Sequence, residues 1–193
     1  MLYLIIIFLS MIVVSGLNIA FNPTFSWYYY VIFVVVCTLL LVIIDGIVAL
    51  VIRLLPNKYF DYHKKAFKTS EFSKKFYRLI KVHKWKDVVP EHGMFTNFRK
   101  NKIYDPNNPI YLERYILEAC YGIMIHYVSV PFSFLVMLCD IYMYNGSSNM
   151  YLTIALPAAI VNAVLIVLPS FVLKNNLPKI VRLYEYKKKK QEK

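Results

Sequence analysis

Four long apolar runs constrain the fold of this chain more than any other feature of its sequence. The runs cover residues 2–20, 27–54, 115–144 and 150–173, and each is uncharged or nearly so. Their lengths are close to or above the ~20 residues that an α-helix needs to cross a bilayer. Because hydrocarbon offers the backbone no hydrogen-bond partner, a spanning segment has to satisfy its own N–H and C=O groups. The sequence therefore predicts an all-α integral membrane protein with four transmembrane helices.

Lys and Arg residues avoid the short connections between paired runs and gather in two segments. Of the 23 such residues, 15 lie between Arg53 and Arg114, and the other eight follow Leu173. Positively charged residues next to transmembrane helices are retained on the cytoplasmic side. We therefore expect cytoplasmic N and C termini in a multi-pass protein of the cell membrane, specifically a bacterial inner membrane.

The runs and the charges together predict four consecutive parts. A first transmembrane hairpin covers 1–54, a basic cytoplasmic headpiece 55–114, a second hairpin 115–173 and a basic cytoplasmic tail 174–193. No basic stretch precedes the first run, which favours a retained helix over the alternative of a cleaved signal peptide. In the tail, Pro178 is expected to stop a helix.

Apolar residues recur at helical spacing within the headpiece, and basic residues lie between them. The apolar set is Phe72, Phe76, Leu79 and Ile80, and the basic set is Lys74, Lys75, Arg78 and Lys81. This pattern is typical of an interfacial helix that lies in the membrane surface. An ordinary amphipathic helix packed on its own domain would show the same pattern, so both readings stay open.

The net charge of +12 does not require a nucleic-acid partner. All of the positive charge lies between or after the apolar runs, where anionic lipid headgroups are found. Membrane lipids are therefore the predicted partners of the basic segments.

Cysteine and motif patterns exclude several chemistries. Cys37, Cys120 and Cys139 each lie inside an apolar run, so we expect small apolar packing and no disulfide framework. The His and Cys residues lack zinc-ligand spacing, and the chain has no Gly-x-Ser-x-Gly elbow and no phosphate-binding Gly loop. The sequence thus predicts no metal site and disfavours a covalent Ser or Cys mechanism.

Ionisable residues inside transmembrane helices are costly and are usually functional. The apolar runs contain Asp45, Glu118, His126 and Asp140. Counting ~1.5 Å per residue from the cytoplasmic ends, Asp45 lies roughly 12 Å deep, and His126 and Asn162 lie about 18 Å deep. Three helices thus place polar groups at similar depth, whereas Asp140 lies at the opposite surface and is expected to be structural.

Glu118 and His126 lie on one predicted helix, two turns apart and offset by ~80° around its axis, so both can face one cavity. A carboxylate can orient an imidazole, and the neutral ring can take a proton from a hydroxyl or an amine. The pair is therefore a candidate general base. The alternative is a buried hydrogen-bonded cluster that fixes helix packing, with His126 bonded to Asn162 or Asp45.

Several short elements of the sequence carry a resemblance to a known family. In chain order they are Leu55 to Phe60, Phe67-Lys68, Val82 to Lys86, Glu118 with His126 eight residues later, Asn162, and Asn176 to Lys179. In this order and at these separations they resemble the glycosyl-4,4'-diaponeurosporenoate acyltransferase family, small bacterial membrane proteins of carotenoid pigment synthesis. The resemblance covers roughly residues 53–182.

The resemblance implies transfer of a fatty acyl chain to a sugar hydroxyl of a membrane-embedded glycolipid-like acceptor. The donor would be acyl-CoA or another acyl thioester from the cytosol, with no bound cofactor. His126 with Glu118 would then deprotonate the acceptor, and Trp85 would pack at the interface. The predicted substrate-binding set is Lys84, Trp85, Lys86, Asp87, Glu91, His92, Asp45, Asn162, Asn176 and Lys179.

Each of these residues also has a structural alternative. Trp85 can serve as an interfacial anchor, and Lys84 and Lys86 can contact lipid headgroups. The Asp87, Glu91 and His92 side chains can simply shape their loop.

Two other functions compete with the enzyme. A non-catalytic scaffold or lipid-binding subunit, holding a partner of a biosynthetic complex at the membrane, would keep the basic headpiece without needing a deep histidine. A small transporter would need a water path, which four helices without repeat symmetry disfavour.

Overall fold

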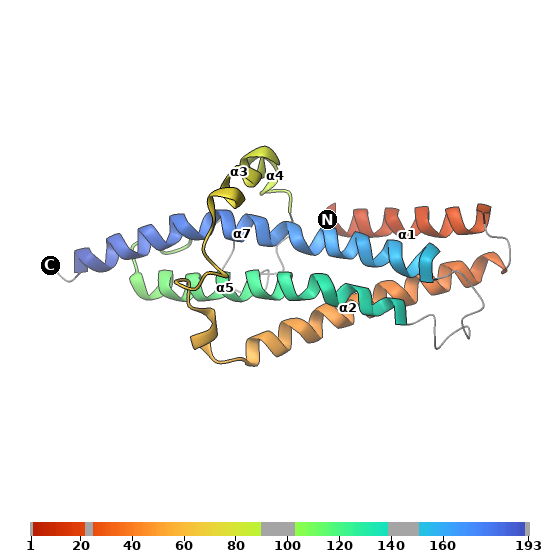
Figure 1. The fold of residues 1–193 in the computed structure, drawn as a ribbon, viewed down its shortest axis with the longest axis horizontal. Coiled ribbons are helices and arrows are strands. Elements are labelled where there is room, and N and C mark those ends of the chain that lie inside the picture. The colour runs from red at the N-terminus through yellow and green to blue at the C-terminus, as the bar shows by residue number, and fades with distance from the viewer. Residues whose placement is uncertain (1, 22–24, 90–102, 139–150, 192–193) are drawn as a thin grey trace. The chain divides into compact units, whose positions relative to one another are not determined.

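The computed structural model describes residues 2–21, 25–89, 103–138 and 151–191, and every regular element among them is helical (Figure 1). The elements are α1 (Leu2–Phe21), α2 (Trp27–Leu54), η1 (Asn57–Phe60), α3 (Glu71–Leu79), α4 (Val82–Trp85), α5 (Pro109–Phe132), η3 (Ser133–Leu138), η4 (Tyr151–Ala155) and α7 (Leu156–Gln191). The predicted all-helical class is therefore confirmed for the described residues.

Three of the helical stretches are long and apolar enough to cross a membrane, judged by length and composition. They are Trp27–Leu54, Pro109–Leu138 and Leu152–Gln191. The first predicted span forms a helix, α1, of 20 residues, within which the described side chains give the shorter apolar stretch Ile5–Phe21. The structure thus supports three candidate spans and one shorter apolar helix where the sequence predicted four spans.

The third span begins earlier than its hydrophobicity indicates. α5 starts at Pro109 and not at Tyr115. Asn108 precedes it, and Asn108 Oδ1 accepts hydrogen bonds from the backbone N–H groups of Ile110 at 3.0 Å and Tyr111 at 3.3 Å. An Asn cap followed by Pro at the first helical position is a strong start signal.

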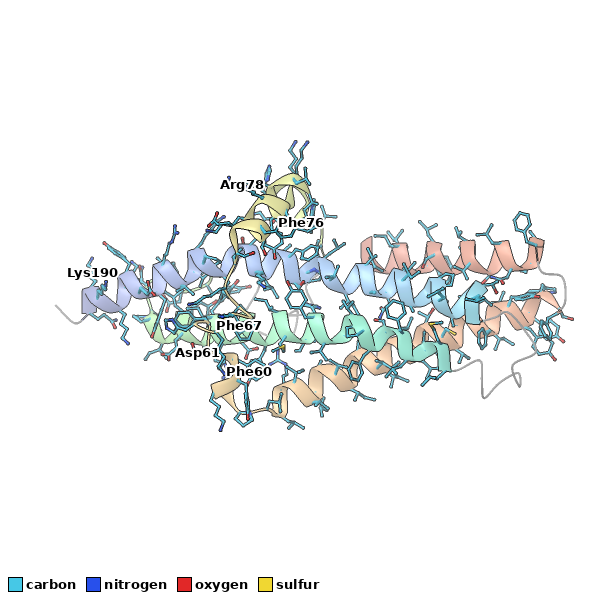
Figure 2. The ribbon with its side chains drawn as sticks, in the orientation of Figure 1. Phe60, Asp61, Phe67, Phe76, Arg78 and Lys190 are labelled. Carbon is cyan, nitrogen blue, oxygen red and sulfur yellow. The ribbon has the colours of Figure 1, made fainter. Side chains whose placement is uncertain are left out.

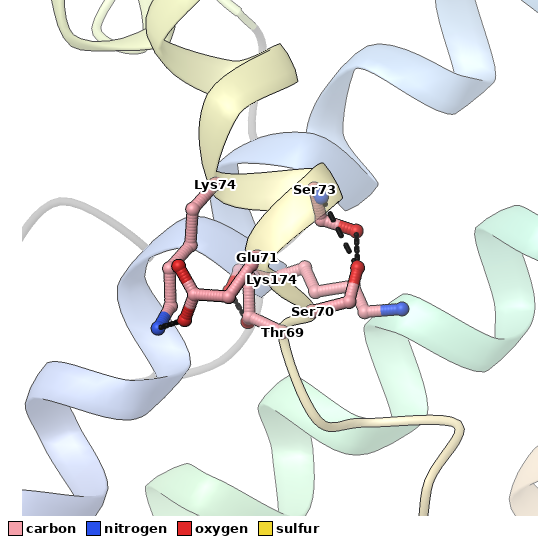
Figure 3. A network of polar contacts seen from close by, with 6 residues as sticks. All are labelled: Thr69, Ser70, Glu71, Ser73, Lys74 and Lys174. Carbon is pink, nitrogen blue, oxygen red and sulfur yellow. Dashed lines mark hydrogen bonds and ion pairs between the residues drawn. The ribbon is translucent and has the colours of Figure 1, made fainter.

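The prediction that Pro178 stops a helix is wrong. α7 continues through Pro169 and Pro178 to Gln191, so most of the predicted tail belongs to this helix. A proline lacks the N–H that would bond to the carbonyl four residues earlier, which for Pro178 is the carbonyl of Lys174. Figure 3 shows the replacement donor: Thr69 Oγ1 donates to Lys174 O at 2.9 Å. A hydroxyl from the headpiece therefore bonds to the carbonyl that Pro178 cannot serve.

The chain folds as two compact units. The first unit comprises Met1–Leu50 and Tyr127–Val167, and the second comprises Val51–His126 and Leu168–Lys193. Each of the helices α2, α5 and α7 contributes one part to each unit. The second unit contains the described part of the predicted headpiece together with parts of all three long helices.

The core of the first unit is one face of α2 packed against η3, η4 and the start of α7. Its buried residues are Tyr30, Phe33, Val34, Cys37, Leu41, Val136, Ile154, Ala155 and Ala159. Ala155 and Ala159 are one turn apart, and their small side chains permit close helix approach. Asn18 Nδ2 also donates to Thr153 O at 3.0 Å, which ties α1 to η4.

The core of the second unit includes a stripe along α5. The stripe has helical periodicity and consists of Leu112, Tyr115, Ile116, Ala119, Cys120 and Ile123. Next to it, a Cβ added at Gly122 would lie 2.8 Å from Leu173 Cδ1. Glycine therefore permits the close approach of α5 and α7 at this point.

α3 is the amphipathic helix that the sequence predicted, and it begins at a capped end. Ser70 Oγ accepts a hydrogen bond from the Ser73 backbone N–H at 3.1 Å (Figure 3). Phe76 and Tyr77 pack against Phe171 of α7, with ring centroids 5.6 and 5.7 Å away. One face of α3 is therefore packed on its own unit, as the second of the two readings expected.

Two apolar side chains of α3 nevertheless remain in the open. Phe72 is 80 % exposed and Leu79 is 77 % exposed. Basic side chains accompany them, including Arg78, which Figure 2 shows projecting from α3. One face of α3 packs on its own unit, and the other face exposes apolar and basic side chains.

Candidate functional site

Glu118 lies at the centre of an ion-paired cluster in the second unit. Its side chain is only 9 % exposed. Arg53 Nη1, from the last turn of α2, lies 3.0 Å from Glu118 Oε2, and Arg114 Nη2, one turn earlier on α5, donates to Oε1 at 2.7 Å. Both carboxylate oxygens are thus engaged by guanidinium groups, in charge-assisted contacts that are stronger than neutral hydrogen bonds.

Aromatic side chains pack against Arg53, one member of this cluster. The Arg53 guanidinium lies over the ring of Tyr121, 5.6 Å from its centroid. The Tyr121 hydroxyl donates to Asn57 Oδ1 at 2.7 Å, and its ring stacks on Phe60 with centroids 4.1 Å apart. Phe60 belongs to η1, directly after α2 (Figure 2). Both η1 and α5 therefore fix the ring on which Arg53 rests.

His126 lies further along α5, about 12 Å from Glu118 along the helix axis at ~1.5 Å per residue. Its side chain is half-buried. The sequence predicted that His126 and Glu118 act as a pair, whereas the contacts described for Glu118 are with Arg53 and Arg114, which the sequence analysis did not foresee. Arg114 could have been found from its i, i+4 spacing to Glu118, whereas Arg53 is brought in only by tertiary folding.

The structure brings Asp45 and Asn162 together within the first unit. Asn162 Nδ2 donates to Asp45 Oδ2 at 3.1 Å and to Ser133 Oγ at 3.0 Å. Ser133 Oγ in turn donates to the Ser129 carbonyl at 3.0 Å. The other carboxylate oxygen, Asp45 Oδ1, and the Ser129 hydroxyl are buried without a hydrogen-bond partner in the described part of the chain. Asp45 and Asn162 therefore belong to a polar cluster, and its hydrogen bonds join them to each other and to Ser133.

The predicted donor-binding segment lies on α4 and the residues that follow it. Lys84 and Asp87 are exposed, and Lys86 is half-buried. Trp85 packs against a buried cluster that includes Val172 of α7, and its indole N–H donates to Ile80 O at 2.7 Å. The indole is therefore occupied in fixing the turn between α3 and α4.

The remaining predicted residues divide into described and undescribed ones. Asn176 is half-buried and Lys179 is exposed, both on the part of α7 in the second unit. Glu91, His92, Asp140 and Cys139 lie outside the described residues. Cys37 and Cys120 are buried free thiols, as predicted. Among the described residues, no group of three or more His, Cys, Asp or Glu side chains could hold a metal ion.

Burial and nearby acidic groups perturb one phenol of the headpiece, Tyr62. The pKa of Tyr62 is raised above its ordinary value of 10.0, chiefly by burial and then by the negative charges of Glu185, Asp61 and Glu113. A phenolate would be repelled by these carboxylates. This part of the second unit therefore has acidic character within a strongly basic chain.

Comparison with known protein families decides the affiliation of the chain. The profile of the glycosyl-4,4'-diaponeurosporenoate acyltransferase family matches residues 56–186, about two thirds of the sequence. The chain belongs to the glycosyl-4,4'-diaponeurosporenoate acyltransferase family. No curated protein and no solved structure matches it. Within this acyltransferase-family region lie Arg114, Glu118 and His126, whereas Asp45 and Arg53 precede it.

Proposed function

We propose that the protein is a membrane acyltransferase. It would move a fatty acyl chain from a cytosolic thioester donor to a hydroxyl or amine of a lipid or glycolipid in the bilayer. The observation that carries the proposal is the family match over residues 56–186. The three apolar helices support the membrane location.

His126 is the proposed general base. Its neutral ring takes the proton of the acceptor hydroxyl while the oxygen forms a new bond to the acyl carbonyl carbon. The carbon–sulfur bond of the thioester breaks, and the departing thiolate takes the proton back from the imidazolium. Glu118, ion-paired with Arg53 and Arg114, would help to place His126 by fixing the part of α5 that precedes it.

The proposed substrate contacts follow the position of the side chains. Lys84 and Lys86 on the headpiece, with Lys179 on α7, would attract the phosphates of the donor. Asp45 and Asn162, which are hydrogen-bonded to each other in the first unit, would contact the acceptor lipid within the bilayer. Trp85 would act indirectly, by holding the turn between α3 and α4.

The proposed orientation places the basic segments at the cytoplasmic face. α3 would then rest on anionic headgroups through Phe72 and Leu79, with Lys75 and Arg78 beside them, since exposed apolar and basic side chains together favour an interfacial position. Attaching a reporter enzyme at residue 193 and a second at the 145–149 connection tests the orientation. Cytoplasmic activity at the second position would contradict it.

The reaction is tested by lipid analysis. Lipid extracts of cells with and without the gene should differ by a lipid species that has gained the mass of an acyl chain. In isolated membranes supplied with acyl-CoA, we expect His126→Ala and His126→Gln to lose most turnover. His63→Gln, a change at an exposed histidine of the headpiece, is the matched control and should stay near wild type. Unchanged turnover in both His126 variants would refute the general base.

A non-catalytic scaffold is the second candidate, and the ion pairs favour it. Both oxygens of Glu118 are held by arginines, an arrangement that can serve structure alone. This candidate predicts lipid extracts that do not differ, together with co-purification of an enzyme of lipid modification. The mass comparison therefore separates the two.

A further inference from the structure

The cluster around Glu118 has one unbalanced positive charge. One carboxylate faces two guanidinium groups, which remain protonated at any physiological pH. Glu118 is nearly buried, whereas Arg53 is 47 % exposed and Arg114 is 53 % exposed. The negative charge of the cluster is thus hidden and the positive charge faces outward.

Both arginines have further N–H groups that can donate hydrogen bonds to a ligand. A guanidinium carries five N–H donors, and the described contacts with Glu118 use one terminal nitrogen of each arginine, Nη1 of Arg53 and Nη2 of Arg114. Both side chains are about half exposed, so part of each planar group remains open to a ligand. Two such groups around one carboxylate can approach one anion from two sides.

The cluster is also held in place before any ligand arrives. Glu118 fixes one end of each guanidinium, and the Tyr121 ring supports that of Arg53. Tyr121 is itself held by its hydrogen bond to Asn57 and by stacking on Phe60. A preorganised site loses less conformational entropy on binding than a flexible lysine does.

The position of the two arginines points to the class of ligand. Arg53 lies in the last turn of the span Trp27–Leu54, and Arg114 lies near the start of the span Pro109–Leu138. The ends of spans are the level of lipid phosphates. Guanidinium geometry matches phosphate oxygens bidentately.

We propose that Arg53 and Arg114, positioned by Glu118, form a phosphate-binding site at the membrane surface. The phosphate belongs either to the carrier portion of a thioester donor or to a lipid headgroup. This site differs from the lysines of the donor-binding segment, and Glu118 serves it as a positioning residue. In its donor form it rests on the proposed acyl transfer, but the binding of phosphate does not.

Two probes distinguish the phosphate sources. The purified protein is studied in maltoside micelles, which contain no phosphate, and it is titrated with coenzyme A or with short-chain phosphatidic acid by calorimetry. Neither titration contains an acyl thioester, so the proposed acyl transfer does not take place in it. Loss of acyl transfer therefore leaves this experiment interpretable.

The variants separate geometry from charge. Arg53→Ala and Arg114→Ala should each weaken the bound probe about tenfold to one-hundredfold, as expected for the loss of charge-assisted hydrogen bonds. Arg53→Lys and Arg114→Lys keep the ion pair with Glu118 and so preserve folding, but lose the planar fork, and should weaken binding several-fold. Arg182→Ala removes an exposed arginine from α7 in the same unit and should change affinity less than about twofold.

Either probe can support the site, and the one that depends on both arginines identifies the source of the phosphate. Affinities for both probes within twofold of wild type in folded Arg53 and Arg114 variants would overturn the proposal. An equal loss in Arg182→Ala would overturn it as well, because the effect would then be due to net charge and not to a site. Failure of the lipid-mass comparison with intact arginine-dependent binding would refute acyl transfer alone.

Discussion

The hydrogen bond from Thr69 to α7 allows a sharp test of how the chain tolerates Pro178. Replacing Thr69 by Val keeps the shape of the side chain and removes the hydroxyl that donates to Lys174 O at 2.9 Å. The carbonyl then has neither the Thr69 donor nor an N–H from Pro178. The net loss of one intramolecular hydrogen bond costs about 0.5–1.5 kcal/mol, so we expect about 1 kcal/mol.

The expectation becomes specific in a double-mutant cycle. Pro178→Ala restores an N–H at position 178 that can reach Lys174 O along the helix. Thr69→Val should therefore cost about 1 kcal/mol in the wild-type background and close to zero in the Pro178→Ala background, a coupling of about 1 kcal/mol. Thr69→Ser keeps the hydroxyl and serves as the matched control.

The assay can follow a tryptophan next to this contact. Trp85 packs against Val172 of α7 within the same unit, so its emission reports docking of the headpiece on α7. With Trp27→Phe present in every variant, SDS titration of the protein in mild detergent gives the free energy of unfolding. Equal costs of Thr69→Val with and without Pro178→Ala would refute the idea that the hydroxyl compensates for the proline.

Three further changes test the local reasoning. Lys81 has a left-handed backbone, with φ of 52°, so Lys81→Gly should raise the free energy of unfolding by up to about 1 kcal/mol, and a loss in the same titration would contradict this. Gly122→Val should lower the thermal midpoint more than Gly122→Ala, because only the smaller side chain can be accommodated by a shift of Leu173 Cδ1, now 2.8 Å from a Cβ at this position. The raised pKa of Tyr62 means that the folded state holds the phenolic proton more tightly than the unfolded state, in which the pKa is near 10.0. Protonated Tyr62 therefore stabilises the folded state fully below about pH 10, and this stabilisation is lost as the pH rises through the folded-state pKa. The free energy of unfolding of Tyr62→Phe, measured between about pH 9 and 11, should therefore fall less steeply than that of wild type, and identical slopes would contradict the assignment.

The candidate site was only partly readable from the sequence. Glu118 stood out because a carboxylate in an apolar run is costly, and Arg114 was available from its helical spacing. Arg53 could not be predicted as a partner of Glu118, since the two are 65 residues apart in the sequence and no local pattern links them. The pairing of Asp45 with Asn162 likewise spans 117 residues. Depth arithmetic could place these two at a similar level, but not in contact.

The helical class and the stretches suited to a membrane were determined by the sequence by itself, because they follow from local composition and from the obligation of the backbone to bond within the chain in hydrocarbon. The start of α5 also follows from a local sequence signal, Asn108 followed by Pro109. The passage of α7 through Pro178 was decided only by the tertiary structure. Proline removes a backbone donor wherever it occurs, and whether the helix survives depends on a replacement, here Thr69, that lies 105 residues away in the chain and beside Lys174 in space.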